Sequence, residues 1–288
     1  MRSRRAFTIT ELLVAMTILV ILAAVLFPVF QSARASVDRS SCASRMKQVF
    51  LAVTLYQNEY DDGYPMVGYQ VNRSPDSATQ DRLWPQLLLP YLKDSRLWAC
   101  PADKSERPRP DTRFNADLSL ADSNSRFYAV AERANLGYNS YNLSPVVRNG
   151  STMFFSPVKA SQVGAPANTI GWVETVWEVR GGATFGGGDY VAEPPCRYVR
   201  ANATFVDTIP GAGPAGRDNG WLVDPEEESV NETTFGGAWG WHGGKLHMLT
   251  LDGRAVLIEP NRLANGCRVE SNWAGAIFDQ QTYLWDLQ

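Results

Sequence analysis

The hydrophobic pattern begins with one long apolar segment. From Leu12 to Phe30 the sequence contains no charged residue. A helix rises about 1.5 Å per residue, so this segment covers roughly 28 Å, close to the hydrocarbon thickness of about 30 Å. The segment therefore predicts a helix that crosses a membrane once.

The residues that follow keep a helical pattern. Apolar residues recur mostly three or four positions apart and form one stripe: Cys42, Met46, Val49, Phe50, Val53, Tyr56 and Tyr60. This spacing predicts an amphipathic helix. The turn formers Asp61 and Asp62, followed by Gly63 and Pro65, predict its end near Tyr60. Only the short stretch 36–44 interrupts the pattern, so we expect one helix of about fifty residues, roughly 75 Å long.

From Tyr64 onward, short apolar runs alternate with Gly, Pro, Asn and Asp, which predicts a β-rich head with long loops. Strands are expected over residues 169–179, 198–206, 245–251 and 254–258. The last two flank Asp252-Gly253, a hairpin signal in which both turn positions favour positive φ. Apolar residues occupy both alternating sets of the strand 245–251, so we expect it to be buried on both faces, with one face under the helical stripe.

An acidic residue directly precedes the apolar segment. A leader from Met1 to Ala6 carries three arginines, Phe7 follows, and Glu11 directly precedes Leu12. Burying an unpaired carboxylate in hydrocarbon is costly, so Glu11 is a candidate functional residue that requires a partner.

This order of parts resembles the class III signal of type IV pilins and type II secretion pseudopilins. The resemblance implies that a prepilin peptidase cuts between Ala6 and Phe7 and methylates the new amino group of Phe7. It also implies that Glu11 pairs with the N-terminus of a neighbouring subunit as a filament assembles. A proline such as Pro28 is common in this region of the family. The family usually has glycine where this chain has Ala6, and alanine is the mildest replacement, so we expect slower processing rather than none.

The C-terminal half carries a second resemblance. His242 precedes Asp252-Gly253 by ten positions, and this H-x9-D-G spacing is similar to the signature of the domain-of-unknown-function 1559 group, a large pseudopilin-like family. Residues 42–48 with 60–65, and the Cys-Pro-x-Asp loop within 98–103, also resemble that family. The resemblance implies an architecture and an assembly, and it supplies no substrate.

These observations together predict an α+β, pilin-like lollipop, in which a long N-terminal helix packs on an antiparallel β-sheet head. Its expected parts are a leader (1–6), a transmembrane and filament-core helix (7–30), an amphipathic continuation (31–60) and an extracytoplasmic head (61–288).

The arginines at positions 2, 4 and 5 predict a cytoplasmic N-terminus and an inner-membrane single-pass protein with its head outside. Expected partners are other copies and related pilin-like subunits, the prepilin peptidase and the assembly platform in the inner membrane.

Charge argues against nucleic acid as a partner. The chain has 27 Lys and Arg against 30 Asp and Glu, and removal of the three leader arginines would leave 24 against 30. Phosphate binding requires a basic stripe, and the sequence shows only scattered cations. We therefore expect no nucleic-acid partner.

The two histidines give no metal motif. His242 and His247 are five positions apart, so in one continuous strand they would point to opposite faces. We therefore expect His242 to make a hydrogen bond near the hairpin and Asp252 to shape the turn. No catalytic set is evident, so we expect no enzyme and no cofactor.

The alternative is a divalent metal site at the end of the hairpin. Zinc usually needs three or four ligands with characteristic spacings, which the sequence lacks. Calcium is the favoured ion, because it accepts irregular sets of oxygen ligands. The candidate ligands are Asp61, Asp62, Asp103, Asp224, Glu226, Glu227, Glu228 and Glu232. A solvated acidic loop is the simpler interpretation of the cluster at 224–232.

Four cysteines in an extracytoplasmic domain allow two disulfides in three connectivities. Pairing Cys42 with Cys100 would tie the first loop to the helix and leave Cys196 with Cys267, and this is the connectivity that we favour.

A second hypothesis is a signal-anchored or secreted binding module, lectin-like and without filaments. Ala33-Arg34-Ala35 has the pattern of a signal-peptidase site, and the nine tryptophans, which include Trp239 and Trp241, could form an aromatic platform. However, the apolar segment is longer than the roughly 7–15 residues of a secretory signal, so the pilin-like interpretation is preferred.

Overall fold

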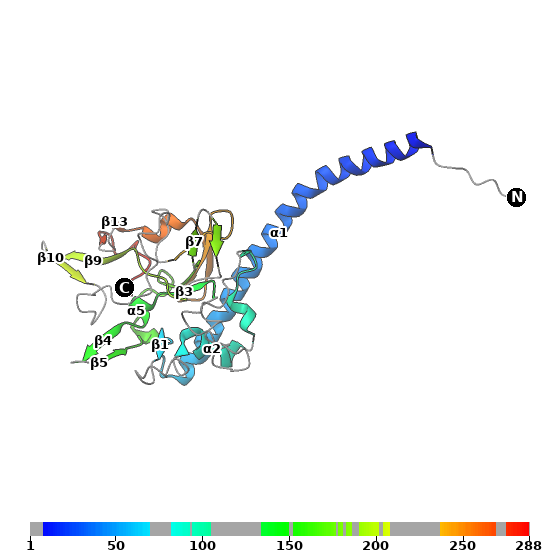
Figure 1. Ribbon diagram of the computed structural model, residues 1–288. Coiled ribbons are helices and arrows are strands. Elements are labelled where there is room, and N and C mark those ends of the chain that lie inside the picture. The colour runs from blue at the N-terminus through cyan, green and yellow to red at the C-terminus, as the bar shows by residue number, and fades with distance from the viewer. Residues whose placement is uncertain are drawn as a thin grey trace.

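The computed structural model describes residues 8–69, 82–92, 94–104, 134–149, 152–176, 178–180, 183–185, 190–201, 204–207, 237–268 and 275–287 of the 288. The predicted leader and Phe7 lie outside these ranges. The fold is the predicted α+β lollipop: a long helix whose second half packs on a head built around an antiparallel sheet (Figure 1).

The helix α1 runs without interruption over Ile9–Glu59. It begins with a capping box, in which the Thr8 hydroxyl accepts a hydrogen bond from the backbone of Glu11 and the Glu11 carboxylate accepts one from the backbone of Thr8. It ends at the cap residue Tyr60, after which Asp61 and Asp62 adopt positive φ of 51° and 65°. The predicted single helix of about fifty residues is therefore confirmed.

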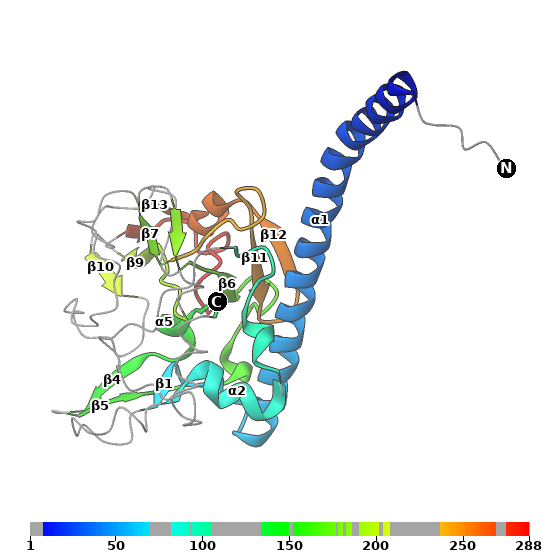
Figure 2. The same cartoon turned by 45° about the vertical axis from the view of Figure 1, so that its right-hand side comes forward.

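The second half of α1 buries one face against the head, and its buried side chains are Cys42, Met46, Val49, Ala52, Val53 and Tyr56. These are mostly the residues of the predicted stripe, although Tyr60, at its end, is exposed. The N-terminal half projects beyond the head in both views (Figures 1 and 2).

The other helices among the described residues are short: α2 (Trp84–Leu92), η2 (Ser95–Trp98), α5 (Ser140–Leu143), η3 (Ala160–Gln162) and η4 (Pro260–Ala264). The strands up to residue 185 are β1 (Gly68–Tyr69), β2 (Arg82–Leu83), β3 (Leu136–Tyr138), β4 (Val146–Asn149), β5 (Thr152–Phe155), β6 (Ile170–Glu174), β7 (Glu178–Arg180) and β8 (Ala183–Phe185). The later strands are β9 (Cys196–Ala201), β10 (Thr204–Asp207), β11 (Leu246–Thr250), β12 (Ala255–Ile258), β13 (Cys267–Arg268) and β14 (Gly275–Ile277).

The sheet that carries α1 is antiparallel and has the order β12-β11-β6-β3. α1 lies against β11 and β12 (Figure 2). A second sheet, β10-β9-β14-β13, includes a parallel pair, β14 with β9. The pairs β1-β2, β4-β5 and β7-β8 complete the described strands.

Strand β11 is buried on both faces, as its sequence predicts. Leu249 belongs to the hydrophobic cluster beneath α1, which includes Trp84, Tyr138 and Trp172. Leu246 and Met248 belong to the cluster on the other face. Every residue of β11 is buried, so this strand lies in the core between the two clusters.

Two expected strands and one expected turn differ from the structure. Residues 198–206 form an antiparallel hairpin, because β9 ends at Ala201 and β10 begins at Thr204. Residues 169–179 divide between β6 and β7. In the turn after β11, only Gly253 has positive φ, at 87°, so the expectation of positive φ at Asp252 is wrong. Four residues, not two, separate β11 from β12, so the loop has no need of two left-handed positions.

Candidate functional site

The first candidate site is the N-terminal turn of α1. The Glu11 carboxylate Oε2 accepts hydrogen bonds from the Thr8 backbone N–H at 2.9 Å and from the Thr8 hydroxyl at 2.8 Å. Both residues are exposed, so the acid caps its own helix in the single chain. The predicted cleavage bond between Ala6 and Phe7 lies outside the described residues.

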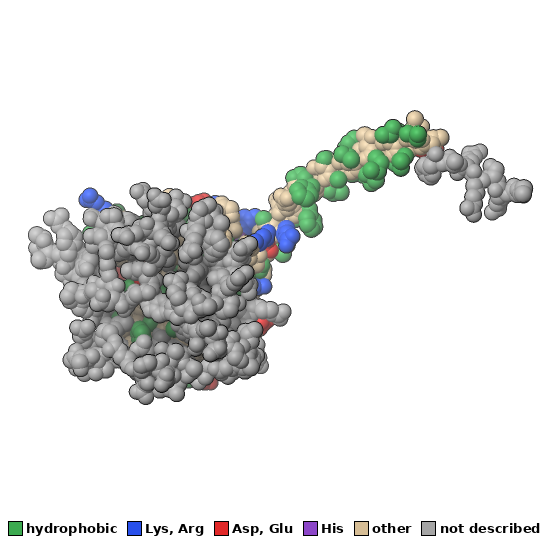
Figure 3. Space-filling model, in the orientation of Figure 1, with side chains coloured by type: hydrophobic (Ala, Val, Ile, Leu, Met, Phe, Trp, Pro, Cys, Tyr) green, Lys and Arg blue, Asp and Glu red, His purple; other side chains and the backbone are tan. Residues whose placement is uncertain are grey.

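Behind Glu11, the apolar segment is exposed on all sides. The consecutive residues Leu12, Leu13 and Val14 are each about 60% exposed. Because neighbouring positions on a helix point in different directions, no side of the helix is covered here. Figure 3 shows this half of α1 covered with hydrophobic side chains beyond the head. Its most apolar 18-residue stretch has a mean hydropathy of 2.9, and none of that stretch is buried, so α1 is long and apolar enough to cross a membrane.

Pro28 lies inside α1, and the helix continues through it. Proline has no N–H to donate to the carbonyl four residues earlier, which is that of Ala24. In a membrane or a filament, neighbouring helices can satisfy such a carbonyl.

The second candidate site is a buried group around Glu174, the last residue of β6. The side chains of Glu174, His242 and His247 are 1%, 2% and 5% exposed. Glu174 Oε1 lies 3.1 Å from His242 Nε2 and 3.3 Å from His247 Nδ1, and Glu174 Oε2 accepts the His247 backbone N–H at 2.7 Å. Burial acts to raise the pKa of Glu174, but the two histidines outweigh it and lower the pKa.

The expectation that the two histidines point to opposite faces is therefore wrong. Their rings lie 4.6 Å apart. His242 does not belong to β11, because Gly243 and Gly244 adopt positive φ and the His242 backbone N–H bonds to Lys245 O in a tight turn. This turn folds His242 back toward Glu174.

The sequence offered little sign of Glu174. It is one acid at the end of an apolar run, Ile170–Val173, and nothing in its spacing links it to residues 242 and 247. The one available signal was an acid at the end of an apolar run that predicts a buried strand, because a buried carboxylate requires partners.

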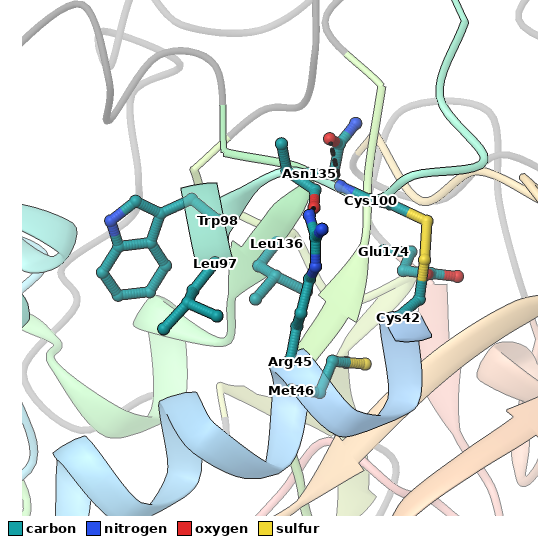
Figure 4. Close-up of a pocket in the computed structure, with 10 residues that line it drawn as sticks. Cys42, Arg45, Met46, Leu97, Trp98, Cys100, Asn135, Leu136 and Glu174 are labelled. Carbon is teal, nitrogen blue, oxygen red and sulfur yellow. Dashed lines mark hydrogen bonds between the residues drawn. A yellow bond between two sulfur atoms is a disulfide. The ribbon is translucent and has the colours of Figure 1, made fainter. Parts of the chain in front are cut away.

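The Cys42–Cys100 disulfide adjoins this group. The structure pairs Cys42 with Cys100 and Cys196 with Cys267, which is the connectivity that we favoured. Cys100 Sγ lies 3.6 Å from His242 Nε2. Figure 4 shows the disulfide beside Glu174, at a cavity of about 10 Å³ that Arg45 of α1 also lines. A space of this size is enough for about one water molecule.

Asp252 and Gly253 lie in the turn between β11 and β12. Asp252 Oδ1 accepts hydrogen bonds from the Thr250 hydroxyl and from the Arg254 backbone N–H, and its Oδ2 accepts one from Arg254 Nε at 2.8 Å. Asp252 is thus the turn-shaping residue that the sequence predicts. It does not lie in the Glu174 group: His242 and Asp252 come at opposite ends of β11.

The described calcium candidates bond to protein groups: Asp61 and Asp62 to the turn at 159–161, and Asp103 to Asn135. Asp61 pairs with Lys159, and this side-chain hydrogen bond lowers the pKa of Asp61. Asp62 accepts the Ser161 backbone N–H, and Asp103 accepts the Asn135 side-chain amide. Asp224 and the glutamates at 226–232 lie outside the described residues.

The tryptophans within the described ranges are either fully buried or half-buried. Trp84, Trp98, Trp172 and Trp285 are fully buried. Trp239 and Trp241 are half-buried, and Trp241 donates its indole N–H to Thr175 O. Most of the described tryptophans therefore pack in the core.

The family model for the prokaryotic N-terminal methylation motif matches residues 1–27. This match indicates a pilin-type protein that is processed by a prepilin peptidase, and it says nothing of the head. No curated protein and no solved structure matches the chain.

Proposed function

We propose that this chain is a pilin-like structural subunit, without catalytic activity of its own, that assembles into a type II secretion pseudopilus or a type IV pilus-like filament. The observation that carries the proposal is the apolar surface around the first half of α1, most of which lies within the matched N-terminal methylation motif. A helix that is apolar on all sides requires lipid or other helices around it.

This surface suits two successive environments. Before assembly it spans the membrane, with the arginines of the leader in the cytoplasm and the head outside. After cleavage before Phe7, the same surface packs against the helices of other copies or related subunits, as in large apolar obligate interfaces. A head-to-tail contact that does not close into a ring produces an open helical array.

Glu11 supplies the specificity of this contact. In the single chain its carboxylate is held by Thr8. In the filament we expect the methylated ammonium group of a neighbouring Phe7 to approach it, because an unpaired charge in an apolar core is strongly disfavoured. Wrong registers leave Glu11 without that partner and are therefore rejected.

Three single substitutions test this function. Glu11→Gln retains a side chain that can cap the helix but removes the charge, whereas Glu11→Ala removes both. Asp38→Ala is the matched control, because Asp38 is an acid of the same helix outside the apolar segment. All three proteins should insert into the membrane and lose the leader.

The amount of protein in sheared filaments distinguishes the three. We expect Glu11→Gln and Glu11→Ala to reduce it about tenfold or more and Asp38→Ala to leave it unchanged. Filament levels of Glu11→Gln equal to those of the wild type would contradict the charge-pairing role. Absence of the wild-type protein from filaments, with glycan binding by its head, would favour the lectin-like binding module instead.

A further inference from the structure

The buried residues around Glu174 include four side chains that could bind a metal ion. The two sulfur atoms of Cys42 and Cys100, a carboxylate oxygen of Glu174 and a ring nitrogen of His242 all lie within 4.8 Å of one another. All four residues are buried. We call these four residues the ligand cluster.

Two edges of the ligand cluster already have the dimensions of a zinc site. Zinc binds sulfur at about 2.3 Å and nitrogen or oxygen at about 2.0–2.2 Å. In a tetrahedral site, a sulfur and a nitrogen ligand therefore lie about 3.6 Å from each other. A nitrogen and an oxygen ligand lie about 3.3 Å from each other. Cys100 Sγ lies 3.6 Å from His242 Nε2, and His242 Nε2 lies 3.1 Å from Glu174 Oε1. The distance between the two sulfur atoms is set by the disulfide bond that joins them.

The surroundings also suit a cation. The His247 backbone N–H holds Glu174 Oε2 and so fixes the direction of the carboxylate, which is how outer partners orient metal ligands. Two thiolates, one carboxylate and a divalent ion sum to one negative charge. Arg45, one turn along α1 from Cys42, lines the same cavity (Figure 4) and offsets that charge.

We propose that the reduced form of this chain binds one zinc ion through Cys42, Cys100, Glu174 and His242, so that the ion and the disulfide are alternative links across the same site. A dithiol reductant gives two electrons and two protons to the Cys42–Cys100 bond and itself becomes a disulfide. Zinc then binds the two thiolates and displaces the two protons. Transfer of the two electrons to an oxidising protein disulfide reverses the exchange and releases the ion. In either state α1 stays attached to the loop that carries Cys100.

The test uses the wild-type, full-length chain in detergent. The protein is reduced with a phosphine, zinc is added or withheld, the thiols are alkylated, and each cysteine is scored by peptide mass mapping. We expect one zinc per chain and at least tenfold slower alkylation of Cys42 and Cys100, with Cys196 and Cys267 unprotected. Equal alkylation of all four cysteines with and without zinc would overturn the proposal, as would protection of the Cys196–Cys267 pair instead.

Two histidine variants supply the matched comparison. His242→Gln removes a proposed ligand and should abolish the protection. His247→Gln removes only a neighbour of Glu174, so it should keep one zinc per chain with affinity lowered by about tenfold. Equal effects of the two substitutions would contradict the ligand assignment. Tetrahedral cobalt absorption with thiolate character, present in reduced wild type and absent from the oxidised protein, is the independent readout; its absence from the reduced protein also overturns the proposal.

Discussion

Gly253 lies close to the helix α1 in the turn between β11 and β12. A Cβ atom at this position would lie 2.6 Å from the Phe50 ring of α1, and the backbone φ of 87° also disfavours any side chain. Gly243 has a similar φ of 67°, but nothing lies within 4 Å of its Cβ position. A substitution at Gly243 therefore measures the free-energy cost of the backbone conformation alone, and one at Gly253 measures that cost together with the cost of the contact with Phe50.

We expect Gly243→Ala to lower the free energy of unfolding by about 1 kcal/mol, from backbone strain alone. Gly253→Ala should cost at least about 2 kcal/mol, because the Phe50 ring must also move. Urea unfolding of the detergent-solubilised proteins measures both changes. Equal losses would show that the contact with Phe50 costs nothing.

Asp252 gives the turn a dependence on pH. Burial acts to raise its pKa, but the hydrogen bonds from Thr250 and Arg254 outweigh this and lower it below the ordinary value of 3.8. A lowered pKa means that the ionised carboxylate stabilises the fold above the unfolded pKa, and that this stability is lost as the pH falls through the folded pKa.

Asp252→Asn keeps an acceptor oxygen but has no charge. We expect it to be about 1 kcal/mol less stable than the wild type at neutral pH, a value kept small because the site is partly exposed. The difference should shrink as the pH falls below about 4. A difference that stays constant across that range in urea titrations would argue against a role for the charge.

At the scale of elements, α1 has two halves with different surroundings. Its second half buries Met46 and Val53 in the head, with 1% and 0% exposure, whereas Leu55 on the same half is 50% exposed. Apolar side chains in this half of α1 therefore stabilise the fold where they are buried, as at Met46 and Val53, and lie on the surface elsewhere, as at Leu55.

Met46→Ala should lower the stability of the subunit by about 2–5 kcal/mol, because it removes buried methylene groups and leaves a cavity. Leu55→Ala should change it by less than about 0.5 kcal/mol. Thermal or urea unfolding of the two variants provides the comparison. A loss for Leu55→Ala as large as that for Met46→Ala would mean that the exposed face of α1 also packs within the subunit.

The elements that could be predicted from the sequence are the ones with local signals. The periodicity of residues 42–60 and the breakers after Tyr60 define α1, and the apolar residues on both faces of 245–251 identify β11. Non-local contacts gave no such signal: the parallel pairing of β14 with β9 joins segments more than seventy residues apart. The convergence of Glu174 with His242 likewise depends on a glycine turn that the spacing of the histidines does not reveal.

At the scale of the whole molecule, the structure combines a cross-linked head with an unburied apolar helix. The two disulfides close segments of 58 and 71 residues. By lowering the entropy of the unfolded chain, each can stabilise the folded state by up to about 4 kcal/mol. The first joins α1 covalently to the loop at Cys100, so the helix would stay linked to the head under force. Such a link suits a subunit that is drawn from a membrane into a filament.

The most direct test of this function is the N-terminal sequence and intact mass of the protein recovered from sheared filaments. The account predicts a chain that begins at N-methylated Phe7 and carries both disulfides. Recovery of the protein only from the soluble extracytoplasmic fraction, beginning at Ser36, would contradict it and would place the function in the head.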